Sequence, residues 1–402
     1  MQDQKTRQMV TELLDRGTVD VIDRKHLTQR LERGDRLRVK LGIDPTGSDL
    51  HLGHTVALRK LRQFQKYGHT AVLIIGDWTA RIGDPSGRKA TRPPLSPAEV
   101  QTHAARYLEQ ISVVLDLDRA EVCRQSEWFD AFTLQTIIEL MGKFTVQQLL
   151  QREDFRERMD AKLDVRFHEP LYCLLQGYDS VPVKADLELG GNDQLFNLLK
   201  GREVQQIYSL PPQDVLTVPL LIGLDGKQKM GKSLNNYIGI FDPPIDMYGK
   251  AMSIPDDLIV HYFTLATDVP VVELKDIEDN LTSGVANPRD LKARLAREIV
   301  MFYHGIARAN DAEAEFNRVF RAKETPSAMP EVALGQATVR ADELLLHIGL
   351  APSKAEAQRL IRQGGVSIAG TVVSEWRQVL TLNDMDVVQV GKRRFVKVRV
   401  AK

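Results

Sequence analysis

The spacing of apolar residues near the start of the chain predicts a strand, a helix and a second strand. Residues 36–43 alternate polar and apolar side chains, which is typical of a half-buried strand. A helix is expected to begin at a cap on Ser48 or Asp49 and to run to about Tyr67 with one apolar face. Residues 70–75 are apolar and rich in β-branched side chains, as in a buried strand. Because strands joined through a helix run parallel, this segment predicts a parallel α/β sheet.

The same pattern predicts the organisation of the rest of the chain. Further elements are expected as helices at 7–33, 98–115 and 131–150 and as strands at 184–189 and 216–222. A mostly helical stretch follows, and a proline-containing segment then separates it from a short mixture of helices and strands. We therefore expect an α/β domain with a parallel sheet at 1–242, a helical domain at 243–323, a linker at 324–337 and a small α+β domain at 338–402.

The distribution of charge along the chain, rather than its total, bears on whether the protein binds nucleic acid. The 402 residues include 54 basic and 54 acidic side chains, so the total charge says nothing about nucleic acid. Residues 340–402, however, hold 11 basic and six acidic side chains, which suits a module that binds nucleic acid. Cys123 and Cys173 lack the spacing of zinc ligands or of a disulfide framework. The polar N-terminus and the short apolar runs lead us to expect a cytoplasmic protein with no membrane segment.

The most informative residues are His51 and His54, which lie three apart at the expected start of the first buried helix. Residues at this spacing share a helix face, and a helix N-terminus offers free N–H groups to a phosphate chain. The imidazoles can donate hydrogen bonds to phosphoryl oxygens, and Gly53 leaves room for a ring against the backbone. Surface histidines without a function are the plain alternative. A metal site is a weaker one, because no third ligand is near in sequence.

A second motif lies in a glycine-rich loop at 223–233, which ends in Lys-Met-Gly-Lys-Ser. Lys229 and Lys232 can close over phosphates and stabilise the charge that develops when pyrophosphate leaves. A solvated cluster of lysines in a turn is the alternative reading.

Together the two motifs resemble the HIGH and KMSKS motifs of the class I aminoacyl-tRNA synthetases, with Gly231 in place of a serine. The resemblance implies a Rossmann-like catalytic domain at 1–242 and an anticodon-binding domain at 243–323. It also implies that Mg²⁺ arrives with ATP as a substrate complex, without a tightly bound cofactor or a protein metal site. The ATP-binding residues it implies are Gly42, Asp44, Thr46, His51, Gly53, His54, Gly191, Asp193, Lys229, Met230, Gly231, Lys232 and Ser233. The catalytic residues it implies are His51, His54, Lys229, Lys232, Arg88 and Arg92.

A third group of residues narrows the choice of substrate. Tyr172, Gln176 and Asp179 have the spacing of one helix face, where a carboxylate needs hydrogen-bond donors such as a phenol hydroxyl. An ordinary amphipathic helix with a polar side is the alternative. This pattern, followed by Gly-Gly-Asn-Asp-Gln at 190–194, resembles the bacterial tyrosyl-tRNA synthetases over essentially the whole chain. In that family it marks the amino-acid and ribose sites.

The resemblance assigns a role to each residue of this pocket. Asp179 would accept the hydroxyl of tyrosine, and Gln194 would lie by its carboxylate. The α-amino group would be held by Asp84, Tyr172 and Gln176. Thr79 matches a pocket threonine of the family. Lys40 stands where many members carry a tyrosine that also contacts the hydroxyl, which places the chain with the second bacterial subtype and leaves the replacement for that tyrosine open.

The C-terminal residues resemble an S4 RNA-binding domain. Its helix from Lys354 to about Gln363 and its basic last strand would bring cations to tRNA phosphates. The candidates are Lys354, Arg359, Arg362, Lys392, Arg393 and Arg394. A solvated charged surface is the alternative. The resemblance also implies a homodimer whose substrates are L-tyrosine, ATP and tRNA(Tyr).

Three rival functions are weighed against this reading. A tryptophanyl-tRNA synthetase would not need Asp179 or an S4-like tail. Another nucleotidyltransferase with an HxGH motif would lack the lysine loop. A non-catalytic RNA-binding relative would be expected to lose one of the two motifs, and both are present here.

Overall fold

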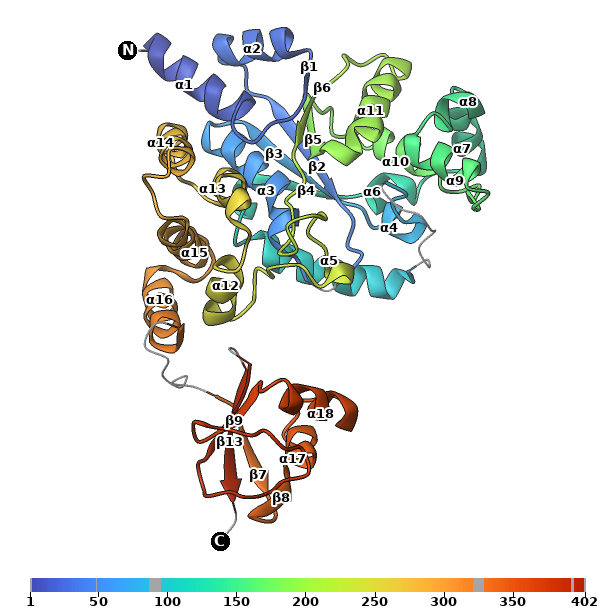
Figure 1. Ribbon diagram of the computed structural model, residues 1–402. Helices are drawn as coiled ribbons and strands as arrows, with labels where there is room; N and C mark the ends of the chain where they lie inside the picture. Colours follow the sequence, from blue (N-terminus) through green and yellow to red (C-terminus); the bar gives the residue numbers. More distant parts are fainter. Residues whose placement is uncertain (1, 48, 87–94, 321–328, 392–393, 401–402) are drawn as a thin grey trace. The chain divides into compact units, whose positions relative to one another are not determined.

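The computed structural model describes residues 2–47, 49–86, 95–320, 329–391 and 394–400 (Figure 1). Contacts within the chain divide it into two compact units, Met1–Ala309 and Asn310–Lys402. No helix of the described residues is both long enough and apolar enough to cross a membrane.

A six-stranded sheet forms the centre of the first unit. Its order is β1-β6-β5-β2-β3-β4, and all neighbours run parallel except β1 with β6. The strands are β1 (Val21–Ile22), β2 (Arg38–Ile43), β3 (Thr70–Ile75), β4 (Ala120–Arg124), β5 (Leu187–Gly191) and β6 (Asp214–Val218). The predicted parallel sheet is confirmed. Because β2 lies between β3 and β5, the strand order reverses there, and ligands of such sheets bind beside the carboxyl ends at that point.

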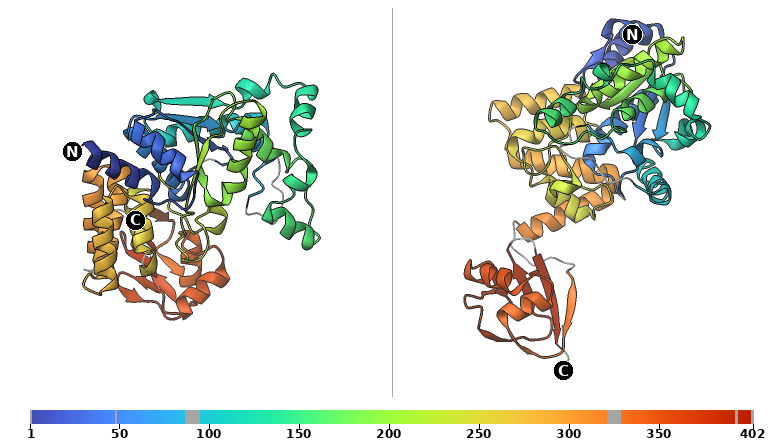
Figure 2. Two further views of the ribbon diagram at one scale, coloured as in Figure 1. Left: turned by 90° about the horizontal axis from the view of Figure 1, so that it is seen from above. Right: turned by 90° about the vertical axis from the view of Figure 1, so that its right-hand side faces the viewer.

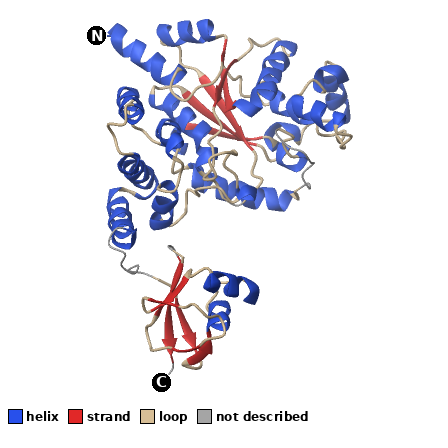
Figure 3. Cartoon of the chain, in the orientation of Figure 1, coloured by secondary structure: helices blue, strands red, loops and turns tan. Residues whose placement is uncertain are grey.

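Helices cover both sides of this sheet (Figure 3). Helix α3 (Leu52–Lys66) packs against β2, β3, β5 and β6. Helices α10 (Leu171–Tyr178) and α11 (Leu195–Ile207) pack on each other, and α11 also packs against β5 and β6. Between β3 and α10 the chain forms α4 (Thr79–Ile82), α5 (Pro97–Ile111), α6 (Ser126–Phe129), α7 (Leu134–Met141), α8 (Val146–Leu149) and α9 (Glu153–Asp160).

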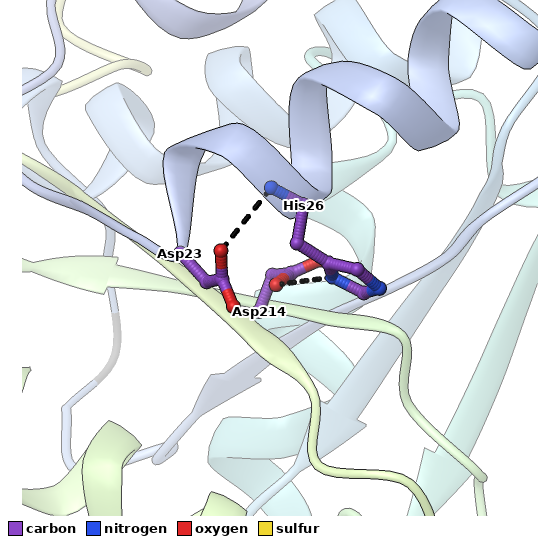
Figure 4. A group of neighbouring side chains, drawn as sticks. All are labelled: Asp23, His26 and Asp214. Carbon is purple, nitrogen blue, oxygen red and sulfur yellow. Dashed lines mark hydrogen bonds and ion pairs between the residues drawn. The ribbon is translucent and has the colours of Figure 1, made fainter.

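The single helix expected at 7–33 is wrong. The structure has α1 (Gln2–Leu14) and α2 (Arg24–Arg33), with the short strand β1 between them. Two backbone positions with positive φ break the helix, Gly17 at 56° and Asp23 at 60°. Asp23 also accepts a hydrogen bond from the backbone of His26 and thereby starts α2. The ring of His26 in turn reaches Asp214, at 3.0 Å, which ties α2 to the sheet (Figure 4).

The predicted helical stretch after residue 243 is confirmed. It consists of α12 (Pro244–Ala251), α13 (Ile259–Ala266), α14 (Val271–Thr282), α15 (Pro288–His304) and α16 (Ile306–Phe320). Helix α13 packs against α3, so this stretch shares a core with the sheet domain as far as Ala309. Helices α12–α15 gather on one side of the unit, and α7–α9 lie on the opposite side (Figures 1 and 2).

The second unit has its own hydrophobic core. A five-stranded sheet has the order β10-β9-β12-β13-β7, and β8 pairs with β11 in a separate ribbon. The strands are β7 (Glu331–Leu334), β8 (Thr338–Arg340), β9 (Val366–Ile368), β10 (Thr371–Val372), β11 (Val379–Thr381), β12 (Val387–Val390) and β13 (Arg394–Val400). Helices α17 (Ala341–His347) and α18 (Lys354–Arg362) pack on each other and enter the core with Leu344 and Ile361. Part of the predicted linker is therefore strand, because β7 pairs with β13.

Candidate active site

The carboxyl edge of the first sheet gathers nearly all the predicted site residues of the first unit. Gly42 and Gly191 lie at the ends of β2 and β5, and the other candidates follow the ends of β2, β3 and β5 or come from α3 and α10. The lysine loop follows β6. Residues as far apart in the sequence as Gly42 and Ser233 are thus brought to one edge, as expected for parallel strands around a change of order.

His51 and His54 form the amino end of α3. His51 is the N-cap residue, in an extended conformation, so the cap expected at Ser48 or Asp49 is wrong; Ser48 itself lies outside the described residues. The two rings stack, with centroids 3.8 Å apart. The backbone N–H of His51 donates to Nδ1 of His54 at 3.2 Å. Each ring therefore has a fixed place at the first helical turn, where the backbone N–H groups of Leu52 and His54 already donate to the carbonyls of Ile238 and His51.

Burial keeps the imidazole of His51 neutral. Its pKa is lowered to about 2, first by burial and then by the neighbouring His54 and Lys232. A neutral imidazole at this place is a hydrogen-bond donor or acceptor rather than a cation. Among the described residues of the two motifs, the positive charge therefore comes from the lysine loop.

The lysine loop is held by a small network around Asn236. The amide of Asn236 accepts from the backbone N–H of Gly231 at 2.8 Å and donates to Asp225 at 2.9 Å. Asp225 also accepts the backbone N–H groups of Lys227 and Gln228, and these hydrogen bonds lower its pKa. The bend that carries the two lysines is thus held by the side chains of Asn236 and Asp225 without the use of the lysine side chains.

Both lysine heads lie on carboxylates in this structure. Lys229 is 3.0 Å from Asp193, and Lys232 is 3.5 Å from Asp49. The side chain of Lys229 is half exposed and that of Lys232 is about one-third exposed, so these ion pairs are weak and can exchange for phosphate oxygens. Ser233 is exposed in the turn that follows.

Met230 connects the two motifs. Its side chain is buried, and its backbone N–H donates to Leu221 at 2.7 Å. A Cβ on Gly53 would lie 3.4 Å from Cβ of Met230 and 3.0 Å from the ring of His51. Gly53 therefore allows the amino end of α3 and the lysine loop to approach each other closely.

Asp44 is the centre of the inner pocket. It accepts the hydroxyl of Tyr172 at 2.9 Å and that of Thr79 at 2.6 Å. A Cβ at Gly76 would come within 2.0 Å of the carboxylate, so the backbone there must be glycine. Burial, and then the charge of Asp44, raises the pKa of Tyr172 well above its usual value. Tyr172 thus stays a neutral donor.

Asp84 and Gln194 form a second polar pair of the pocket. The amide of Gln194 donates to Asp84 at 2.7 Å and accepts from Asn197 at 2.9 Å. Arg152 continues this chain by donating to Asn197 and to Ser86. Arg88 and Arg92 lie outside the described residues.

Asp179 is a fully buried carboxylate with two donors. Gln125 donates to it at 2.7 Å and the indole N–H of Trp128 at 3.2 Å. Burial raises its pKa to about 7, against the opposing effects of Lys40 and of these hydrogen bonds. The sequence analysis missed Gln125 and Trp128. They follow β4, and a strand predicted at 120–124 would have placed them at the same edge of the sheet.

Lys40 does not enter the pocket. It is completely buried, and its Nζ lies 2.9 Å from Oε1 of Glu188 and 2.8 Å from Oγ of Ser180. It also donates to the backbone carbonyl of Gln176 at 2.9 Å. Lys40 thereby joins the central strand to the end of α10, where Gln176 and Asp179 lie.

The candidate RNA-binding residues of the second unit differ in their surroundings. Lys354 pairs with Glu343 at 3.0 Å and Arg359 with Glu356 at 2.6 Å. Arg394 donates to the backbone carbonyl of Leu350, and Arg362 is exposed at the end of α18. Lys392 and Arg393 lie outside the described residues.

Comparisons with known proteins agree with this geometry. Residues 32–321 match the family of class I tRNA synthetases (W and Y), and residues 339–386 match the S4 domain. A tyrosine–tRNA ligase of Thermotoga maritima is 48% identical over 386 residues, which cover 96% of each chain. One of Ralstonia nicotianae is 46% identical over 391 residues, which cover 96% of this chain and 99% of that protein.

Solved structures share the fold at lower identity. The tyrosyl-tRNA synthetase of Archaeoglobus fulgidus complexed with L-tyrosine has a TM-score of 0.61 at 21% identity, covering 77% of this chain and 99% of that one. A tryptophanyl-tRNA synthetase of Encephalitozoon cuniculi has a TM-score of 0.59 at 13% identity, covering 77% and 91%. The likeness to both groups reflects the common catalytic fold. With its two motifs, its pocket and nearly full-length relatives, the chain belongs to the class I tyrosine–tRNA ligases that carry a C-terminal S4 domain.

Proposed function

We propose that this chain activates L-tyrosine with ATP and transfers the tyrosyl group to the 3′-terminal adenosine of tRNA(Tyr). The observation that carries the proposal is the buried carboxylate of Asp179, held by two N–H donors in the same unit whose sheet edge carries the histidine and lysine motifs. A phenol hydroxyl is the neutral donor that suits such an acceptor. The proposal includes a cytoplasmic location for the reaction.

In the first step, a carboxylate oxygen of tyrosine attacks the α-phosphorus of ATP, and the bond to the β-phosphate oxygen breaks. The products are tyrosyl-adenylate and pyrophosphate. In the second step, a ribose hydroxyl of the terminal adenosine attacks the carbonyl carbon, AMP leaves with the electron pair of the broken mixed-anhydride C–O bond, and the hydroxyl proton passes to the departing phosphate or to water. No side chain forms a covalent intermediate, so catalysis rests on positioning and on charge stabilisation.

The cationic groups act on the phosphates. Lys229 and Lys232 would leave Asp193 and Asp49 and bind the oxygens of the departing pyrophosphate. His51, which is neutral, and His54 would donate hydrogen bonds at the α-phosphate. These donors suit phosphate oxygens rather than Mg²⁺, so the magnesium ion would enter as part of the ATP complex.

The polar groups of the pocket would hold the amino acid and the ribose. Gln176 has a buried side-chain oxygen with no hydrogen-bond partner in the described part of the chain, which supports its role in binding the α-amino group. Asp84 and Tyr172 would complete that site. Gln194 would lie by the carboxylate of tyrosine. Asp193 and Gly191 would touch the ribose once Lys229 has moved.

Amino-acid-dependent exchange of pyrophosphate into ATP tests the proposal. Tyrosine should support rapid exchange, whereas phenylalanine and tryptophan should support it only weakly, because neither places a hydroxyl against Asp179. Lys232→Ala should slow exchange with tyrosine by about 10²–10³-fold, the usual effect of removing one stabilising donor. Rapid exchange with tryptophan would assign the chain to the sister activity, and exchange with none of the three would contradict a ligase function.

We further propose that the protein is a homodimer that uses the surface of residues 134–167. Apolar side chains on and after α7–α9 are unusually exposed: Leu134, Ile138, Val146, Leu163 and Phe167, the last at 82%. An apolar pocket of about 640 Å³ lies beside them, between Phe129, Phe132, Ile137 and Leu171. Exposed apolar patches of this kind mark interaction surfaces, and a second copy of the same chain is the commonest partner.

Phe167→Asp should therefore convert the dimer into a monomer, which light scattering after size exclusion would measure. It should also impair tRNA charging if one tRNA contacts both subunits. Val272→Asp is the matched control, because Val272 is 78% exposed on α14, on the opposite side of the unit. A Phe167→Asp variant with the mass of the unsubstituted protein would contradict this interface.

A further inference from the structure

Trp376 lies at the centre of an arginine cluster in the second unit. The guanidinium of Arg377 is 4.5 Å from the centroid of the indole, that of Arg340 is 5.6 Å away and that of Arg362 is 5.9 Å away. The arginines come from three places: the end of β8, the end of α18 and the loop before β11. The indole itself is half-buried and packs on the hydrophobic core of the unit.

The charges of this cluster are mostly uncompensated. Arg340 is 3.0 Å from Asp342, a fully buried carboxylate. Neither Arg362 nor Arg377 has a carboxylate within ion-pair distance among the residues that the structure describes. Of the three arginines, only Arg340 thus has a carboxylate partner among the described residues, whereas Lys354 and Arg359 are each paired with one. The charge available to an anionic partner is therefore greater around Trp376 than at the two ion-paired residues.

The indole gives this charge a defined position. A cation over the face of a tryptophan is attracted by the ring, and the planar guanidinium group keeps its hydrogen-bond donors free at its edge. Arginines fixed in this way can bind phosphate oxygens with two hydrogen bonds each and with little loss of conformational freedom. A chain of phosphates is the ligand that satisfies several such groups at once.

We propose that Arg362, Arg377 and Arg340, positioned by Trp376, form the phosphate-binding surface through which the second unit contacts the backbone of the tRNA substrate. The inference rests on the proposed function, since it takes tRNA as the partner of the S4 domain. It also revises the sequence-based candidates, because it assigns Lys354 and Arg359 a smaller contribution and adds Arg340 and Arg377. In this surface, Trp376 is a positioning residue and touches no phosphate itself.

The salt dependence of tRNA binding by the full chain tests this surface. The double variant R362Q/R377Q should bind tRNA(Tyr) on the order of tenfold more weakly, because hydrogen bonds to charged groups are lost. The slope of log Kd against log salt should fall by about one for each phosphate contact removed. The variant K354Q/R359Q removes the same charge from ion-paired residues and should change both quantities much less.

Two further measurements separate this inference from the proposed function and from misfolding. Tyrosine-dependent pyrophosphate exchange should be unchanged in both double variants, because the first unit carries that step. Trp376→Leu keeps an apolar side chain on the core but removes the ring. The variant should bind tRNA more weakly, while its thermal unfolding temperature should stay within a few degrees of that of the unsubstituted protein. Unchanged tRNA affinity and slope in R362Q/R377Q, or an equal loss in K354Q/R359Q, would overturn the proposal.

Discussion

Replacing Lys40 with methionine should destabilise the folded chain by about 3–5 kcal/mol, because Glu188 would remain buried without its cation. The two side chains are 0% and 1% exposed, and their charged atoms are 2.9 Å apart. Glu188 would keep its hydrogen bonds from Gln213 and Ser180, which do not neutralise its charge. Denaturant unfolding monitored by circular dichroism would measure the loss.

The double variant Lys40→Met with Glu188→Gln is the matched control. It removes both charges and should recover much of the lost stability, because no unpaired charge then remains in the interior. A Lys40→Met variant as stable as the unsubstituted protein would show that the buried pair contributes nothing that methionine cannot replace.

Lys40 should also affect the reaction through Asp179. The carboxyl of Asp179 has its pKa raised to about 7 by burial, and the charge of Lys40 opposes that rise. Removing Lys40 should therefore raise the pKa of Asp179 further. An ionised Asp179 accepts a stronger hydrogen bond from tyrosine than a protonated one. Consequently kcat/KM for tyrosine should rise with pH through about 7, and the midpoint should move upward in Lys40→Met.

A merely structural role for Lys40 would not move that midpoint. The double variant with Glu188→Gln separates the two effects, because it restores stability while the positive charge near Asp179 is still missing. Glu188 itself raises the pKa of Asp179, so the midpoint of the double variant should lie below that of the single variant. Identical midpoints in all three proteins would contradict the electrostatic link.

The sequence allowed the centre of the fold to be predicted but not its edges. The strands at β2 and β3 were found because they alternate or are continuously apolar, as buried strands are. Strand β4 was missed because it lies at the edge of the sheet, with Glu121 and Val122 exposed. Because β4 was not predicted, Gln125 and Trp128, the two donors to Asp179 that follow it, were not recognised as site residues.

Contacts between residues far apart in the chain could not be predicted from the sequence. Lys40 stood out as a departure from the family pattern, but its partner Glu188 is 148 positions away and was not recognised. The same holds for α18. Its charge pattern indicated the basic residues of the helix, but it did not show that Lys354 pairs with Glu343 and Arg359 with Glu356. Local spacing thus predicted which residue types gather, and the fold decided which charges remain available.

Replacing Asp179 with asparagine should reduce kcat/KM for tyrosine by about two orders of magnitude. The loss of a hydrogen bond to a charged acceptor accounts for about 1.5–3 kcal/mol. In addition, Gln125 and Trp128 both donate to the carboxylate, so an amide there must turn its own N–H groups toward one of two donors. The side chain can then no longer present a free acceptor to the substrate hydroxyl.

The selectivity of the variant distinguishes this role from general damage to the pocket. Phenylalanine makes no hydrogen bond to Asp179, so its weak activity should fall little, and the ratio of kcat/KM between tyrosine and phenylalanine should shrink by about the same two orders of magnitude. Asp77→Asn is the matched control, because Asp77 is also a buried carboxylate and, among the residues that the structure describes, accepts from Ser126 alone. If Asp179→Asn kept its preference for tyrosine, the hydroxyl would have to be recognised elsewhere. Lys40, which faces Glu188 and the end of α10, could not supply that recognition from its present position.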